Sequence, residues 1–233
     1  MPGYATKQES IAIAGVDDLI IRSLLDRLQY CDPDGDAARL GISSASWPLF
    51  GLLWPSAIHL AARLAQRTVS ATERILEIGC GLALASLVGH RRGADVTASD
   101  RHPLAETFLE ANLLANRLPP MKYRHGEWGP PPSVAKREGV PTVRVVEGRF
   151  DLIVGSDVLY ERDANADLAR FMALHAAAAA EVWIVDPDRG NRPAFNRQMA
   201  AEGFSLHERR LVRPASLGVP AYKGRMLTYS RTA

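Results

Sequence analysis

The stretch RILEIGCGLALAS, from Arg74 to Ser86, decides the fold. It begins as a short apolar run typical of a buried strand, passes two glycines, and continues with the apolar spacing of a helix. Gly79 and Gly81 carry no side chains, so a ligand can approach the backbone there, and the start of the following helix offers unpaired N–H groups. A strand, a glycine turn and a helix in this order predict one unit of a parallel α/β sheet, with a ligand site at the carboxyl end of the strand.

The same alternation continues on the C-terminal side of this stretch. Strands are predicted over Arg74–Gly79, Asp95–Asp100, Met121–Gly126, Phe150–Gly155 and Glu181–Asp186, and helices over Leu82–Arg92, Pro103–Arg117, Ala164–Ala180 and Ala194–Glu202. Two further strand-like runs, Phe204–Val212 and Tyr222–Ser230, have no crossover helix between them and should pair antiparallel. The predicted fold is therefore α/β: a Rossmann-like, seven-stranded, mostly parallel sheet with helices on both faces and an antiparallel last strand.

Length and composition fit a single substantial core. The chain has 233 residues, of which 47% are hydrophobic and 23% charged. We expect an N-terminal extension, partly helical, over residues 1–46 and the main domain over residues 47–233. The Pro-rich, charged segment Gly129–Arg149 between the third and fourth strands is expected to be a surface excursion, with room for a short hairpin.

Charge and residue usage argue against several classes of partner. A net charge of +2 with scattered arginines does not indicate a nucleic-acid groove. The six histidines show no ligand spacing, so no metal is expected. The start of the chain, MPGYATKQES, lacks a signal-peptide pattern, and no segment has the roughly 18 apolar residues that a membrane span needs. With only Cys31 and Cys80, a disulfide framework is not indicated, and we expect a cytoplasmic protein.

The glycine turn can be distinguished from a dinucleotide-binding fingerprint. That fingerprint has a third glycine at the position of Leu84 and does not require an acid at Glu77, two residues before the first glycine. Asp100 ends the second predicted strand, nineteen residues after Gly81, where its carboxylate can accept hydrogen bonds from both hydroxyls of a ribose.

Glu77-x-Gly79-x-Gly81-x-Ala83 resembles motif I of class I, or seven-β-strand, S-adenosylmethionine-dependent methyltransferases. Four other stretches, GLLWPSAIHLAARL (51–64), GEWG (126–129), DLIVGSDVLYE (151–161) and VDPDR (185–189), are similar to those of the protein-lysine methyltransferase branch, methyltransferase family 16, which is marked by an Asp-x-x-Tyr motif. The resemblance covers most of Leu49–Phe204. Ala83 in place of the usual glycine, the excursion after Trp128 and the N-terminal region depart from the family pattern.

By position, the resemblance implies both a cofactor site and a catalytic rim. The implied cofactor contacts, to S-adenosylmethionine, are Trp54, Glu77, Gly79, Gly81, Asp100, Trp128 and Ser156. Asp157 and Tyr160 are the implied catalytic pair at the end of the fourth strand. Simpler readings also exist for some polar residues: Asn112 and Asn116 can decorate the exposed face of a helix, and Asp186 and Asp188 can serve a turn around Pro187.

The chemistry assigns Asp157 a role other than that of a base. Methyl transfer from a sulfonium releases a neutral thioether, so the reaction needs no general acid. A lysine amine must first lose a proton, which costs about 4 kcal/mol at neutral pH because its pKa is about 10.4. A carboxylate stabilises the ammonium form, so we assign Asp157 to capturing and aiming the substrate and Tyr160 to narrowing the channel.

The resulting hypothesis is an N-methyltransferase that acts on a lysine side chain of a protein substrate. A small-molecule methyltransferase remains open as an alternative. A nucleic-acid methyltransferase is less favoured, because SDVLY (156–160) lacks the Asn/Asp-Pro-Pro-Tyr/Phe pattern of adenine-modifying enzymes. A non-catalytic module that binds the cofactor or a partner protein is the third alternative.

Overall fold

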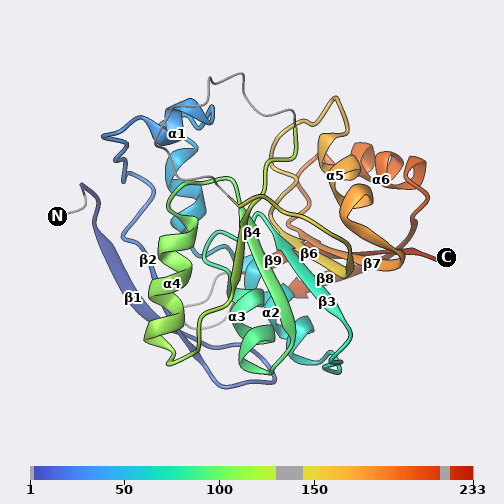
Figure 1. Ribbon diagram of the computed structural model, residues 1–233, viewed down its shortest axis with the longest axis horizontal. Coiled ribbons are helices and arrows are strands. Elements are labelled where there is room, and N and C mark those ends of the chain that lie inside the picture. The colour runs from blue at the N-terminus through green and yellow to red at the C-terminus, as the bar shows by residue number, and fades with distance from the viewer. Residues whose placement is uncertain (1–2, 130–143, 216–220, 233) are drawn as a thin grey trace.

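The computed structural model describes residues 3–129, 144–215 and 221–232. A seven-stranded sheet with the strand order β5-β4-β3-β6-β7-β9-β8 forms its centre (Figure 1). The strands are β3 (Arg74–Ile78), β4 (Asp95–Asp100), β5 (Lys122–His125), β6 (Phe150–Ser156), β7 (Ala176–Asp186), β8 (Ser205–Arg213) and β9 (Tyr222–Arg231). The strands β3 to β7 pair parallel with their neighbours, and β9 is antiparallel to both β7 and β8. The predicted fold class is confirmed.

Successive residues of the central strands enter opposite halves of the core, as the two-residue period of a strand requires. Ile75 and Val154 belong to the cluster that also contains the apolar faces of α2 (Pro55–Ala65), α3 (Leu84–Arg91) and α4 (Ala105–Ala115). Leu76 and Ile153 belong to the cluster built with α5 (Asp167–His175) and α6 (Arg192–Ala201). Helices therefore cover both faces of the sheet, and the central strands lie between the two layers of helices.

The helix predicted over Ala164–Ala180 is wrong in its last five residues. The helix α5 ends at His175, and the alanine run 176–180 is the first half of β7. Alanine favours helices in isolation, but here Ala176 pairs with Phe150 of β6 and Ala180 pairs with Arg231 of β9. Main-chain pairing on both sides outweighs a propensity of only tenths of a kcal/mol per residue.

The N-terminal region consists of a two-stranded antiparallel sheet and short helical turns. The strands β1 (Thr6–Ile11) and β2 (Leu19–Leu24) form the sheet, which the sequence analysis did not foresee. The helical content is α1 (Asp36–Arg39), and η1 (Trp47–Gly51) opens the next segment. Buried side chains of β2 join the same core cluster as α2 and α4.

Two asparagines of α4 attach this hairpin to the rest of the molecule, and Figure 1 shows β2 running beside α4. Asn112 accepts a hydrogen bond from the N–H of Arg22 at 2.7 Å, and Asn116 accepts one from the N–H of Ile20 at 2.8 Å. Both amide groups also donate to the carbonyls of the same two residues, at 3.4 and 2.7 Å. The reading of these asparagines as surface decoration is therefore wrong: Asn112 is fully buried.

Most of the Pro-rich excursion lies outside the described residues, and so does the hairpin suggested for it. Of its described end, Val145 forms an isolated parallel bridge with His125, and Val146 donates its N–H to the His125 carbonyl at 3.1 Å. The division of the chain at residue 46 remains a prediction.

Candidate active site

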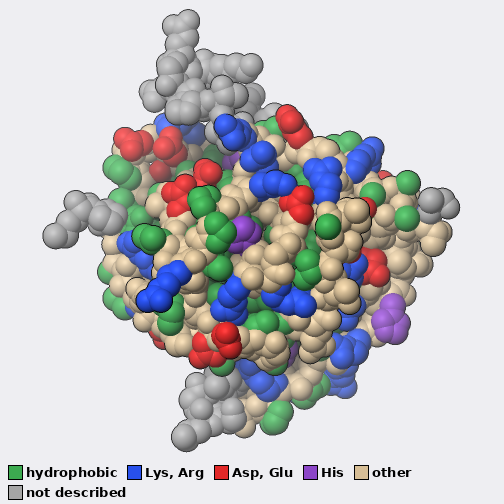
Figure 2. Space-filling view, turned by 60° about the horizontal axis from the view of Figure 1, so that its bottom comes forward, with side chains coloured by type: hydrophobic (Ala, Val, Ile, Leu, Met, Phe, Trp, Pro, Cys, Tyr) green, Lys and Arg blue, Asp and Glu red, His purple; other side chains and the backbone are tan. Residues whose placement is uncertain are grey.

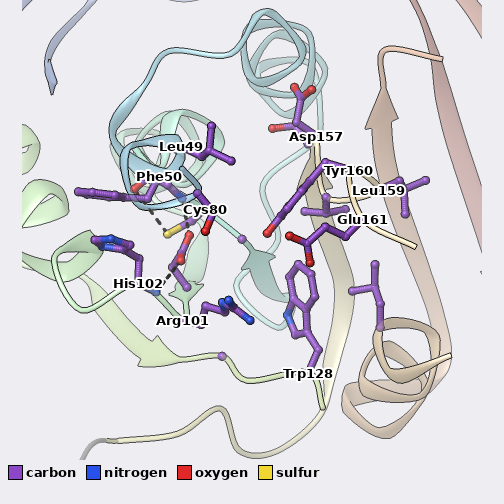
Figure 3. Close-up of a pocket in the computed structure, with 18 of the residues that line it drawn as sticks. Leu49, Phe50, Cys80, Arg101, His102, Trp128, Asp157, Leu159, Tyr160 and Glu161 are labelled. Atoms are coloured by element: carbon purple, nitrogen blue, oxygen red, sulfur yellow. Dashed lines mark hydrogen bonds between the residues drawn. The ribbon is translucent and has the colours of Figure 1, made fainter. Parts of the chain in front are cut away.

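A cavity of about 600 Å³ opens where β3, β4 and β6 end (Figure 3). Parallel strands of an open α/β sheet place their ligand sites at this edge. Eight of the nine predicted site residues line it: Trp54, Gly79, Gly81, Asp100, Trp128, Ser156, Asp157 and Tyr160. Glu77 does not line the cavity.

The glycine turn fits tightly against its neighbours. Gly79 and Gly81 have φ angles of +54° and +51°, in the left-handed region that favours glycine. A Cβ on Gly81 would lie 2.7 Å from the carbonyl oxygen of Phe50 in η1, and one on Gly79 would lie 3.0 Å from Val158. Ala83 also adopts a left-handed conformation, with φ of 59°, which explains why a glycine is usual at this motif position.

Glu77 supports the glycine turn from behind. Its carboxylate accepts hydrogen bonds from the N–H of Ser86, at 2.7 Å, and from the Ser86 hydroxyl. The carboxylate thus satisfies a free N–H in the first turn of α3. Burial raises the pKa of Glu77 to about 7, against the lowering effect of the Ser86 hydrogen bonds. Glu77 is buried and its carboxylate is engaged by Ser86, so its contact with the cofactor remains a prediction.

Asp100 connects the ends of two strands. Its Oδ2 accepts a hydrogen bond from the N–H of Gly81 at 2.9 Å, and its Oδ1 accepts one from the N–H of His102 at 2.8 Å. Burial raises the pKa of Asp100, and the backbone hydrogen bonds oppose that rise. Each oxygen retains a second lone pair, so the carboxylate can accept further hydrogen bonds in the cavity.

The two tryptophans lie on different walls. Trp54 immediately precedes α2, and its indole N–H donates to the carbonyl of Leu49 at 2.8 Å. The indole of Trp128 lies next to Gly79, with ring atoms 3.4 and 3.5 Å from where a Cβ would be. Its Nε1 is buried and has no hydrogen-bond partner among the described residues. A Cβ on Gly79 would make ordinary van der Waals contact with this indole, so the positive φ angle and the 3.0 Å approach to Val158 are what favour glycine there.

Asp157 is held at the end of β6 in a strained conformation. Its φ angle is 58°, and its N–H donates to the carbonyl of Val185 in β7 at 3.0 Å. The side chain is 9% exposed, and its Oδ1 lies 3.1 Å from Nη2 of Arg189. Burial raises the pKa of Asp157, while Ser56 and the charge of Arg189 lower it. A left-handed non-glycine residue at a ligand site is a form of strain that proteins retain for function.

Tyr160 points into the cavity in Figure 3, between Asp157 at one end of the view and Trp128 at the other. Its side chain remains accessible, since the residue is 43% exposed. The Asp-x-x-Tyr spacing therefore places a buried carboxylate and an accessible phenol on one wall.

Sequence reasoning missed several cavity residues, which are Phe50, Arg101, His102, Glu127 and Arg189. The ring of His102 stacks on Phe50 with centroids 3.7 Å apart, and burial lowers its pKa to about 3. Arg189 and Glu127 belong to the stretches VDPDR (185–189) and GEWG (126–129), which follow predicted strands. Their position after the strand ends could have indicated that they line the site. The neighbouring Asp186 accepts a hydrogen bond from the N–H of Asp188 at 3.0 Å, as a turn role requires.

Comparison with known proteins agrees with the geometry. Residues 48–192, which include every residue of the predicted site, match the lysine methyltransferase family. The chain belongs to the lysine methyltransferase family. The resemblance drawn from the motifs is thereby confirmed.

Curated members of related type share part of the chain. It is 35% identical to mouse protein N-lysine methyltransferase METTL21A over 120 residues, which is 50% of this chain and 51% of the mouse protein. It is 27% identical to the calmodulin-lysine N-methyltransferase of Arabidopsis thaliana over 127 residues, 51% of this chain and 38% of that protein. These matches thus span about half or less of the relatives' length.

Solved structures show the same fold as this lysine methyltransferase family member. A methyltransferase from Pyrococcus furiosus aligns with a TM-score of 0.56 and 19% identity, covering 84% of this chain and 98% of the other. The magnesium protoporphyrin IX methyltransferase of Synechocystis, solved with bound S-adenosylmethionine, aligns with a TM-score of 0.54 and 16% identity, covering 76% and 78%.

Neither a metal-binding cluster nor a membrane-spanning helix is present among the described residues. No group of three or more His, Cys, Asp or Glu side chains in residues 3–129, 144–215 and 221–232 is arranged to hold a metal ion. In the same part of the chain, every helix is too short or too polar to span a bilayer.

Proposed function

We propose that this protein is an S-adenosylmethionine-dependent N-methyltransferase that methylates a lysine side chain of a protein substrate. The observation that carries the proposal is one cavity lined by both the motif I glycines and the Asp157–Tyr160 pair, in a chain of the lysine methyltransferase family. The names of METTL21A and of the calmodulin-lysine methyltransferase support a protein substrate.

The cavity residues fit S-adenosylmethionine. The volume of about 600 Å³ lies in the range of small-molecule sites. The turn at Gly79 and Gly81 brings bare backbone to its wall, and Asp100 offers carboxylate oxygens to ribose hydroxyls. The buried Nε1 of Trp128 and Nε2 of His102, which have no partners among the described residues, are donors for polar atoms of a ligand. Bound there, S-adenosylmethionine supplies a methyl group on a cationic sulfur.

The protein's task is then to present a neutral amine to that methyl group. The nitrogen lone pair forms the new N–C bond as the C–S bond breaks. The electron pair of the C–S bond remains on sulfur. The proton that the ammonium must lose first passes to water. Asp157 captures and aims the substrate side chain, and Tyr160 narrows its channel. Positioning of this kind can contribute about 7–11 kcal/mol to lowering the barrier.

A labelling experiment tests the proposal. Purified protein is incubated with labelled S-adenosylmethionine and a cell extract, and the labelled species are identified by mass spectrometry. Methyl-lysine in a protein is the expected result; label in small metabolites or RNA alone would contradict it. Asp157→Ala should abolish labelling while S-adenosylhomocysteine still raises the melting temperature, which shows that the cofactor site is intact.

The remaining expectations stay predictions. These are a cytoplasmic location, the absence of nucleic-acid partners, and the contact roles of the individual site residues. On the face shown in Figure 2, Lys and Arg side chains are mixed with acidic ones.

A further inference from the structure

The carboxylate of Asp157 has two oxygens in different situations. Oδ1 lies 3.1 Å from Nη2 of Arg189, whereas Oδ2 is buried and has no hydrogen-bond partner of normal geometry among the described residues. The side chain is more than nine-tenths buried, and a buried carboxylate oxygen without a partner is costly. One oxygen of Asp157 is thus buried without a partner in the wall of the cavity that Asp157 lines.

Arg189 lies in the loop between β7 and α6, and hydrogen bonds and ion pairs hold this loop in place. The N–H of Asp188 donates to Asp186 at 3.0 Å, and Asp188 is ion-paired with Arg192 and Arg225 at 3.3 and 3.0 Å. The guanidinium of Arg189 also lies over the ring of Trp54, 5.4 Å from its centroid. Two contacts and a fixed loop keep this cation in place, although its side chain is 37% exposed.

The groups that face Asp157 come from four segments. They are Ser56 of α2, Asp186 at the end of β7, Arg189 in the loop that follows, and Tyr222 of β9. The hydroxyls of Ser56 and Tyr222 are 2.9 Å apart. Asp186 adds negative charge once it ionises, and burial raises its pKa to about 6. Arg189 is the cation of this set that pairs with Asp157, whereas the charge of Arg192 acts on Asp186.

This balance bears on the free-energy cost of deprotonating a lysine. An isolated Asp157 would hold the substrate as an ammonium ion, which has no lone pair to attack the methyl group. A neighbouring cation weakens that effect without removing the hydrogen-bond acceptor. Building on the proposed lysine methylation, we propose that Arg189 is a positioning residue: it pairs with Oδ1 of Asp157 and cancels its charge, so that Oδ2 aims the substrate amine without trapping it protonated.

The pH dependence of turnover tests this role. The substrate is the protein that the wild-type enzyme labels in the extract, purified and assayed from about pH 6 to about pH 10. A charge close to a titrating group shifts the pKa of that group by about 1–3 units. Without the charge of Arg189, the pKa of the substrate amine should be higher, so Arg189→Gln should move the rise of kcat to higher pH by at least about one unit. At pH 7 its kcat should fall about tenfold or more, with KM unchanged or lower. Arg189→Lys keeps the charge and should keep the wild-type profile.

A structural role for Arg189 would give a different result. If Arg189 only supported the structure, Arg189→Gln would lower kcat at every pH without shifting the pH profile, and Arg189→Lys would not restore kcat. Either outcome overturns the proposal. The matched control is Arg197→Gln, which removes an exposed charge from α6 and should leave the profile unchanged. Melting temperatures and S-adenosylhomocysteine affinities of all variants show whether the fold and the cofactor site persist.

A binding measurement gives an answer that does not need turnover. At pH 7 n-butylamine is almost wholly a cation, as a lysine side chain is. In the presence of S-adenosylhomocysteine, n-butylammonium should bind Arg189→Gln about tenfold or more tightly than it binds the wild type or Arg189→Lys. Equal binding by all three would overturn the role of Arg189. A wild type that labels no protein would instead overturn the proposed function, so the two failures are distinguishable.

Discussion

Gly81→Ala should disrupt the glycine turn in two additive ways. The φ angle of +51° puts an alanine in the left-handed region, which costs about 1–2 kcal/mol. The new Cβ would lie 2.7 Å from the Phe50 carbonyl oxygen, and because this is a backbone atom, η1 must shift, at a cost typical of overpacking, about 1–3 kcal/mol. The free energy of unfolding should therefore fall by about 2–5 kcal/mol, and the melting temperature by roughly 10 °C.

Gly93→Ala is the matched control. Gly93 also has a positive φ, +85°, but a Cβ there would meet nothing within 4 Å. Only the conformational cost of about 1–2 kcal/mol should remain. Because Gly81 and Phe50 both line the cavity, calorimetry should show S-adenosylhomocysteine binding weakened about tenfold in Gly81→Ala, a loss of about 1.4 kcal/mol, and unchanged in Gly93→Ala. Equal losses of stability and affinity in the two variants would refute the argument from the Phe50 contact.

Three further predictions concern residues around the cavity and the hairpin. The pKa of Glu77 is raised to about 7, so the folded state keeps a proton that the unfolded chain releases near pH 4.5. The free energy of unfolding should therefore fall by up to about 3 kcal/mol as the pH rises between these two values. Urea unfolding should show a smaller fall in Glu77→Gln. Trp128→Ala should weaken S-adenosylhomocysteine binding about tenfold, and Trp128→Phe less, by calorimetry. Asn112→Ala should lower the free energy of unfolding by about 2–4 kcal/mol, by denaturant titration.

Each of these has a result that contradicts it. Parallel pH curves for the wild type and Glu77→Gln would mean that Glu77 is not the group responsible. Full affinity in Trp128→Ala would remove the indole from the ligand site. A loss well below 1 kcal/mol in Asn112→Ala would show that the two hydrogen bonds to Arg22 do not hold the hairpin.

The sheet and the edge that carries the site were predictable because they depend on local patterns. Apolar runs with glycine or acidic residues at their ends specify strands whose carboxyl ends meet, and Gly81 and Asp100 were found in this way. In the structure the N–H of Gly81 donates to Asp100. The distance between two strand ends follows from parallel pairing alone, so no knowledge of side-chain packing was needed.

Features that depend on contacts between distant segments were not predictable. Asn112 has the sequence context of any helical surface residue, and only the presence of β2, ninety residues earlier in the chain, makes it a buried anchor. The alanine run 176–180 is likewise a strand only because β6 and β9 flank it. Glu77 was recognised as significant from its position in the motif, but its direction depends on Ser86 in the next helix.

Arg189 shows how a pairing of this kind changes the chemistry expected of a site. From the sequence, Asp157 is a lone acid at the end of a strand, and a lone acid would favour the ammonium form of a lysine substrate. In the structure it is half of an ion pair whose cation, Arg189, comes from the loop that follows a different strand, β7. A carboxylate whose charge is balanced can still accept a hydrogen bond, so capture of the amine and release of its proton no longer oppose each other. A carboxylate paired with Arg189 can therefore lie at the reaction centre, where an unpaired carboxylate would hold the amine protonated.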